Sequence, residues 1–232
     1  MSSIVCAGFE VLMMALFIYC LIYEIAGYGQ RIYQLLLTAV YGYVLEVMTV
    51  LFFSEYSYSN RYNVRFFGVP VAIGFFWSIV IYLSDKATKR LRLPSWLRPF
   101  SAALIAVSAD LLIDPVAIRL GLWSWHVSLD SNWFGVFFGN YYGWFFVVSL
   151  WLGLYQLLVQ VIGQDVTREV LRVSAATIFS LLALPVLLYV SRRILGGLTP
   201  LLGSTPLIVV LVVIAVLTVW EIMEYRLVKK VA

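Results

Sequence analysis

Seven long apolar runs dominate this chain, and each is close to the length that crosses a lipid bilayer. A transmembrane helix needs about 20 mostly apolar residues, because a helix rises about 1.5 Å per residue. Hydrophobic residues make up 63% of the chain and charged residues 12%, whereas soluble domains carry about 25% charged residues. The predicted spans are Ile4–Ala26, Ile32–Phe53, Phe66–Leu83, Phe100–Leu120, Asn140–Ile162, Val173–Tyr189 and Pro206–Tyr225.

The connections between these runs are short, which leaves no room for an appended soluble domain. The sequence therefore predicts an all-α membrane protein of seven transmembrane helices, with residues 1–232 forming a single polytopic membrane domain. The first run has no basic leader and no small-residue cleavage site, so we expect a retained helix rather than a signal peptide.

The positive charges predict the orientation of the helices. If the N-terminus is outside, eleven of the sixteen Lys and Arg residues lie on the inner side and five on the outer side. Inner loops are generally the ones enriched in Lys and Arg. We therefore expect an N-out, C-in topology, and the net charge of +4 is explained by inner loops rather than by nucleic-acid binding.

The middle of the chain contains a repeat with an offset of 67 residues. The repeated pattern is aromatic-x-aromatic, then Phe-Gly-Val, then a Trp nine residues after the Gly. The aligned residues are Tyr56 with Trp123, Tyr58 with Trp125, Phe67-Gly68-Val69 with Phe134-Gly135-Val136, and Trp77 with Trp144. Both copies run in the same direction, so we expect a parallel repeat of spans two and three with spans four and five. The alternative is chance matching, since 16% of the residues are aromatic.

Three carboxylic acids lie within apolar runs of this repeat. Asp110 and Asp114 are four residues apart and share one face of a helix, and Glu46 lies near the corresponding end of the earlier run. Ionisable groups inside a membrane are costly, so they predict a functional site. The structural alternative is a pair that bonds a neighbouring helix just before Pro115.

Aromatic and amide side chains surround these acids in the sequence. Tyr56, Tyr58, Trp123 and Trp125 cluster in two matching loops next to the acids. An interfacial aromatic belt is the alternative explanation for them. Asn140 opens the fifth span, where its amide either orients a water or a carboxylate or caps the helix.

The chain offers little for a metal or a cofactor. It has one histidine, His126, which we expect in an exposed loop, and two cysteines, Cys6 and Cys20, on one predicted helix. Fourteen residues of helix separate the two thiols by roughly 21 Å, too far for a disulfide. No nucleotide-binding glycine motif is present. We therefore predict no metal and no cofactor.

Two segments resemble a known family. The matching residues are Glu46, Tyr56-Ser-Tyr58, Phe67-Gly68-Val69-Pro70, Trp77, Asp110-x3-Asp114-Pro115, Trp123-x-Trp125, and Gly135-x4-Asn140-x2-Gly143-Trp144. This pattern is similar to that of the integral-membrane carotenoid biosynthesis proteins typified by bisanhydrobacterioruberin hydratase and the related cyanobacterial carotenoid hydratase. The chain departs from the family pattern at Phe53-Ser54-Glu55, where the family has a glycine-rich run, and at Phe137, where it has a proline.

The resemblance implies a cofactor-independent hydro-lyase. Such an enzyme adds water across the terminal isoprene double bond of a long acyclic carotenoid (C40 or C50). The chemistry needs an acid that protonates the alkene, a wall that stabilises a tertiary carbocation, and a held water. A carboxyl group in an apolar cavity can remain a proton donor near neutral pH, because its charged form is poorly solvated.

The resemblance also suggests a role for each residue. Asp114 or Asp110 is the expected acid, and Glu46 is its partner or the base. Substrate-binding residues are expected to be Tyr56, Tyr58, Trp77, Trp123, Trp125, Asn140 and Trp144, with Asn140 placed to hold the water. The expected location is a prokaryotic plasma membrane, where the partners are the polyene substrate, membrane lipid and other membrane enzymes of the carotenoid pathway.

Two other functions fit the same residues. A carotenoid cyclase uses the same protonation but captures the cation with an internal double bond. A transporter or lipid-binding membrane protein uses buried acids to carry protons or cations. Product masses separate the first alternative from hydration, and pH-dependent flux in liposomes would identify the second.

Overall fold

The computed structural model describes residues 3–27, 31–53, 55–91, 93–126, 132–163 and 168–196. Within these ranges, six helices are long and apolar enough to cross a membrane. They are α1 (Ser3–Ala26), α2 (Ile32–Phe53), α3 (Val71–Thr88), α4 (Arg98–Arg119), α5 (Phe138–Ile162) and α6 (Glu169–Gly196). The expected seventh span, Pro206–Tyr225, lies outside the described residues.

Two of the predicted spans start more than two residues away from their helices. The third was expected from Phe66, but α3 begins at Val71. Residues 65–70 form a hairpin instead, because Phe67 and Gly68 adopt positive φ angles of 51° and 80° and Pro70 is extended. The sixth helix is longer than its apolar run, since α6 begins at Glu169, whose carboxylate pairs with Arg172 inside the protein.

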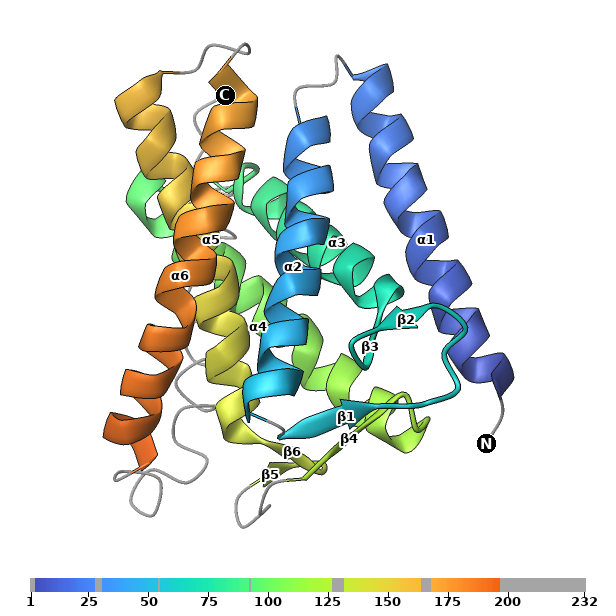
Figure 1. Cartoon of the computed structure of the whole chain (residues 1–232). Helices are drawn as coiled ribbons and strands as arrows, with labels where there is room; N and C mark the ends of the chain where they lie inside the picture. Colours follow the sequence, from blue (N-terminus) through green and yellow to red (C-terminus); the bar gives the residue numbers. More distant parts are fainter. Residues whose placement is uncertain are drawn as a thin grey trace, which may run out of the picture.

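The helices alternate in direction, so the end of each helix lies at the same side of the bundle as the start of the next. At one end of the bundle, α2 and α4 finish and α3 and α5 begin, and all six short strands lie there (Figure 1). The strands are β1 (Tyr56–Tyr58), β2 (Arg65–Phe66), β3 (Val69–Pro70), β4 (Trp123–Trp125), β5 (Asn132–Trp133) and β6 (Val136–Phe137). We call this side of the molecule the strand end.

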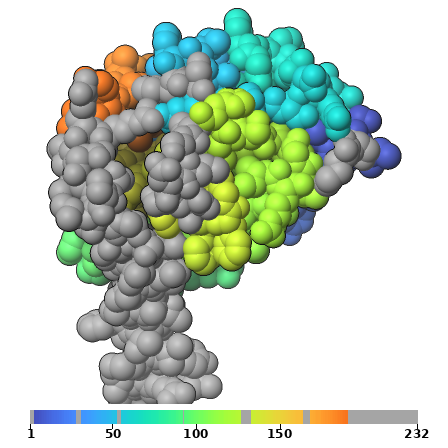
Figure 2. Space-filling model, turned by 90° about the horizontal axis from the view of Figure 1, so that it is seen from below, coloured from blue at the N-terminus to red at the C-terminus, as the bar shows by residue number. Residues whose placement is uncertain are grey.

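Strands β1 and β4 pair in a register that relates the two repeats by a local two-fold axis. Their antiparallel ladder joins Tyr56 to Trp125, Ser57 to Ser124 and Tyr58 to Trp123. Ser57 and Ser124 are themselves 67 residues apart, so the ladder is centred on equivalent residues. Seen from the strand end, the cyan segment of the first repeat borders the green segment of the second (Figure 2).

The two hairpins that lead into α3 and α5 repeat the same geometry. In the first, Arg65 pairs with Pro70 and Phe66 with Val69. In the second, every partner lies 67 residues later. Phe67 and Phe134, at the equivalent turn positions, both have φ of 51°. The sequence repeat is therefore matched by repeated elements, and α5 begins 67 residues after α3.

Close packing of α2 on α3 sets the position of Trp77. A Cβ atom added to Gly42 would lie 2.2 Å from Cβ of Trp77, and one added to Gly74 would lie 2.7 Å from the carbonyl oxygen of Ala39. These contacts leave room only for hydrogen at the two glycines. The indole of Trp77 is therefore held between the helices and reaches the interior near the strand end.

Candidate active site

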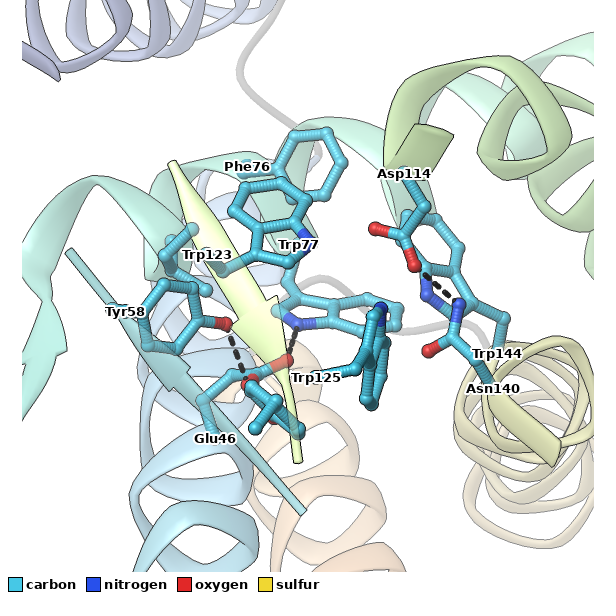
Figure 3. A pocket seen from close by; sticks show the side chains of 11 residues that line it. Glu46, Tyr58, Phe76, Trp77, Asp114, Trp123, Trp125, Asn140 and Trp144 are labelled. Atoms are coloured by element: carbon cyan, nitrogen blue, oxygen red, sulfur yellow. Dashed lines mark hydrogen bonds between the residues drawn. The ribbon is translucent and has the colours of Figure 1, made fainter. Parts of the chain in front are cut away.

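A small cavity opens inside the bundle near the strand end, and both repeats contribute to its walls. The empty space between its walls, with the open mouth included, is about 350 Å³. The lining residues are Glu46, Tyr56, Tyr58, Ile73, Phe76, Trp77, Asp114, Trp123, Trp125, Asn140 and Trp144. Glu46 lies on one side and Asp114 with Asn140 on the other, with indole rings between them (Figure 3).

Glu46 is buried and surrounded by hydrogen-bond donors. Its carboxylate accepts a bond from Nε1 of Trp77 at 2.7 Å, one from the hydroxyl of Tyr58 at 2.7 Å, and one from the hydroxyl of Tyr56. Burial and the neighbouring Glu46 carboxylate raise the pKa values of the Tyr56 and Tyr58 hydroxyls well above the usual range of tyrosine. Both hydroxyls therefore stay protonated. Three donors suit an ionised carboxylate, because each stabilises the negative charge.

Asp110 and Asp114 form a second, different acidic site on α4. Nδ2 of Asn140 donates to Oδ2 of Asp110 at 2.7 Å and to Oδ2 of Asp114 at 2.6 Å. One amide group therefore holds both carboxyl groups. Asp114 faces the cavity, whereas Asp110 is completely buried behind it and is not a lining residue.

The alternative role for Asn140 as a helix cap is wrong. Phe137 occupies the N-cap position of α5, and the Asn140 side chain lies in the first turn, where it points to α4. The amide therefore joins the start of α5 to the two acids, a contact that agrees both with an amide that binds a carboxylate and with the structural alternative of acids that bond a neighbouring helix.

Pro115 lies inside α4 and does not end it. Because proline has no N–H, the carbonyl of the residue four positions earlier, Leu111, loses its helical donor. Nε1 of Trp133 donates to that carbonyl at 2.9 Å. The helix therefore continues to Arg119, and Asp114 keeps a helical position despite the proline that follows it.

The aromatic side chains of the two matching loops line the cavity. The rings of Trp77 and Trp144 lie 4.5 Å apart between centroids. Tyr56 packs on Trp125 at 4.9 Å and Tyr58 on Trp123 at 5.9 Å. Ring faces attract cations more strongly when water is excluded, by about 1–2 kcal/mol each.

The other face of the β1–β4 ladder is polar. Side chains alternate along a strand, so Ser57 and Ser124 point away from the tyrosines and tryptophans. Oγ of Ser57 lies 2.8 Å from Nε2 of His126. His126 is exposed and lies just after β4, as expected of a loop residue, and its backbone N–H bonds the carbonyl of Glu55.

The structure brings the predicted site residues together, although their roles stay predictions. Both Glu46 and Asp114 line one cavity, as do all seven expected substrate-binding residues. The sequence interpretation missed Ile73 and Phe76, which also line it. Helical spacing was the signal for Ile73, which lies four residues before Trp77, whereas Phe76, one residue before Trp77, had no such signal. Among the described residues, no three His, Cys, Asp or Glu side chains are grouped to hold a metal ion.

Comparisons with known proteins agree with the residue pattern. A family model described as carotenoid biosynthesis protein matches residues 5–211. No curated protein and no solved structure matches the chain. The family match covers nearly the whole length, including all six helices and the cavity between them. The chain therefore belongs to the carotenoid biosynthesis protein family.

Proposed function

We propose that this protein is a carotenoid hydratase that adds water to the terminal isoprene double bond of an acyclic carotenoid. The observation that carries the proposal is the presence of two unlike acidic sites on one aromatic cavity. Among the described residues, Glu46 has three hydrogen-bond donors and no acidic neighbour bonded to it, whereas Asp114 bonds Trp123 and shares the Asn140 amide with a second acid, Asp110. Hydration needs both a proton donor and a proton acceptor.

Asp114 is the proton donor in this proposal. Two neighbouring carboxyl groups cannot both carry a charge at low cost, so Asp110 and Asp114 hold a proton between them. Asp114 lines the cavity and Asp110 does not. Asp114 therefore transfers the proton to the CH carbon of the terminal double bond, and Asp110 is a positioning residue that acts through Asp114 and Asn140.

The resulting tertiary cation is stabilised by the cavity walls. Protonation moves the π electrons into the new C–H bond and leaves the positive charge on the carbon with two methyl groups. The rings of Trp123, Trp125 and Trp144 line the space where this charge develops. The Glu46 carboxylate adds a full negative charge on the opposite wall.

Water completes the reaction. A water oxygen attacks the cationic carbon and loses a proton to Glu46, which then returns it to the aspartate pair through water. The net change is one added water, with no electron gained or lost. Glu46 and Asn140 provide polar groups for holding this water, which favours hydration over cyclisation. All three acids lie toward the strand end, which favours a one-sided pocket over a transport route.

The cavity lining supports binding of one carotenoid end. Its walls are mostly aromatic and apolar, with polar groups from Glu46, Asp114 and Asn140, as in other small-molecule sites. By the same resemblance in residues, we place the enzyme in a prokaryotic plasma membrane, near the enzymes that supply its polyene.

Expression in a lycopene-producing bacterium tests the reaction. Extracted pigments should gain the mass of one water, or of two if both ends react. Pigments with unchanged mass but an altered absorption spectrum would instead indicate cyclisation. A pigment profile identical to that of the empty host would contradict the proposal.

Three amide variants test the roles of the acids. Asp114→Asn should lower hydration by about 100-fold or more, because a general acid contributes roughly 10²–10⁴-fold. Glu46→Gln should also be strongly impaired, and Asp110→Asn less so. Glu10→Gln is the matched control, since Glu10 on α1 bonds Asn63 and Val64 outside the cavity. Full activity in all three site variants would exclude the mechanism.

A further inference from the structure

Gly143 on α5 has no packing role that explains a glycine. A glycine inside a helix costs about 1 kcal/mol relative to alanine. Gly42 and Gly74 are explained by close contacts of α2 with α3. A Cβ atom added to Gly143 would meet no heavy atom within 4 Å, and its φ lies outside the positive range. Gly143 is half-buried and adjoins Asn140 and Trp144, which both line the cavity.

The repeat shows which side chain is missing at this position. Gly143 lies 67 residues after Phe76, which lines the cavity. The ring of Phe76 packs on Trp144 at 5.6 Å and on Trp77 at 6.4 Å. The local two-fold axis therefore relates a filled position in the first repeat to an open position in the second.

The helix pairs around the cavity show the same asymmetry. The two-fold axis relates the pair α3 and α4 to the pair α5 and α2. Helices α3 and α4 pack closely, whereas α2 and α5 do not. Farther from the strand end, the hydroxyl of Tyr41 on α2 bonds the carbonyl of Val147 on α5 at 3.2 Å. The space beside Gly143 is therefore bounded by this bond on one side and by the strands on the other, with α6 packed on both helices.

We infer that the polyene chain of the substrate leaves the cavity past Gly143, between α2 and α5, while its terminal isoprene unit lies at Asp114. This inference rests on the proposed function for the identity of the ligand. A conjugated carotenoid chain is rigid and apolar and far longer than the cavity. It needs an apolar path out of the cavity, which here runs between α2 and α5 on the side that α6 covers, and a glycine on this path leaves room for its methyl branches.

Pigment binding tests this inference independently of turnover. The background is Asp114→Asn, which should bind pigment without converting it. The protein is purified from a lycopene-producing bacterium, and the bound pigment is measured by visible absorption. Adding Gly143→Leu should lower the bound pigment by roughly tenfold or more, since a misfit in an apolar site costs at least that factor. Adding Gly143→Ala should leave most of the pigment bound.

The control is Gly8→Leu on α1, where an added Cβ also meets nothing within 4 Å but the position is exposed away from the cavity. It should retain pigment, and thermal stability in detergent should show that each variant is folded. Equal pigment in the Gly143→Leu and control proteins overturns the inference, as does a lack of pigment in all of them. Pigment binding by a wild-type protein that yields no hydrated product contradicts the proposed function alone.

Discussion

Hydrogen-bond donors decide what a buried carboxyl group does. Tyr58 and Trp77 offer Glu46 only N–H and O–H groups, which stabilise a negative charge. Asp114 bonds Trp123 and shares the Asn140 amide with a second acid, Asp110, and two adjacent carboxyl groups favour holding a proton between them. Acids of the same chemical type can therefore take opposite roles in one cavity, because their neighbours differ.

Replacing Tyr58 by Phe tests the donor network at Glu46. The change removes a hydrogen bond to a charged group, so we expect a loss of about 1.5–3 kcal/mol in unfolding free energy, together with slower hydration. Tyr62→Phe is the matched control. The Tyr62 ring lies 6.5 Å from that of Tyr58, and its buried hydroxyl has no hydrogen-bond partner among the described residues. Thermal unfolding in detergent measures both variants. Equal losses of unfolding free energy in the two would contradict a hydrogen-bond network at Glu46.

At the level of elements, each hairpin before α3 and α5 has a turn that holds a phenylalanine in an unfavourable backbone conformation. A two-residue turn with positive φ at both positions usually contains Asn-Gly or Gly-Gly. Here it contains Phe67-Gly68 and Phe134-Gly135. A non-glycine residue in this conformation costs roughly 1–2 kcal/mol. Both phenylalanine rings are largely exposed, so burial inside the protein does not offset that cost.

Phe67→Asn should therefore stabilise the first hairpin. Asparagine tolerates positive φ, and we expect a gain of about 0.5–1 kcal/mol in unfolding free energy. Phe66→Asn is the control, because Phe66 is also exposed but lies in strand β2 with ordinary φ. A loss of stability for Phe67→Asn in lipid nanodiscs would show instead that the Phe67 ring contributes through contact with lipid.

The whole molecule has two chemically different ends. The strand end carries the cavity, the acids and the aromatic rings. At the other end, Arg31 and Lys89 pair with Asp85 at 3.0 and 3.4 Å, and Lys86 pairs with Glu24. Because cytoplasmic loops are enriched in Lys and Arg, this basic end is expected inside and the strand end outside.

Cysteine labelling tests this orientation. Ser124→Cys at the strand end should react with a membrane-impermeant maleimide in intact cells, whereas Ser95→Cys, which is exposed near the start of α4, should react only after permeabilisation. The native Cys6 and Cys20 are buried and should give little background. The reverse labelling pattern would show that the N-terminus is inside.

Much of the fold was predictable because a bilayer imposes a local rule on sequence. Five of the six helices were located to within a few residues at their start, since each needs about 20 apolar residues. The 67-residue repeat was also visible, because matching residues at a fixed offset need no knowledge of contacts. The start of α3 was misplaced, since Phe66 is apolar but the turn at Phe67 and Gly68 keeps it in a strand.

The sequence by itself determined the membrane class, the family and the set of acids and aromatic residues. Only the tertiary structure decided how they are used: that Asn140 joins Asp110 to Asp114, that Glu46 receives its donors from Trp77 and two tyrosines, and that β1 pairs with β4 about a two-fold axis. The physical reason is distance along the chain. Hydrophobic length is a local property, whereas a cavity wall is made by side chains that packing brings together from helices far apart in sequence.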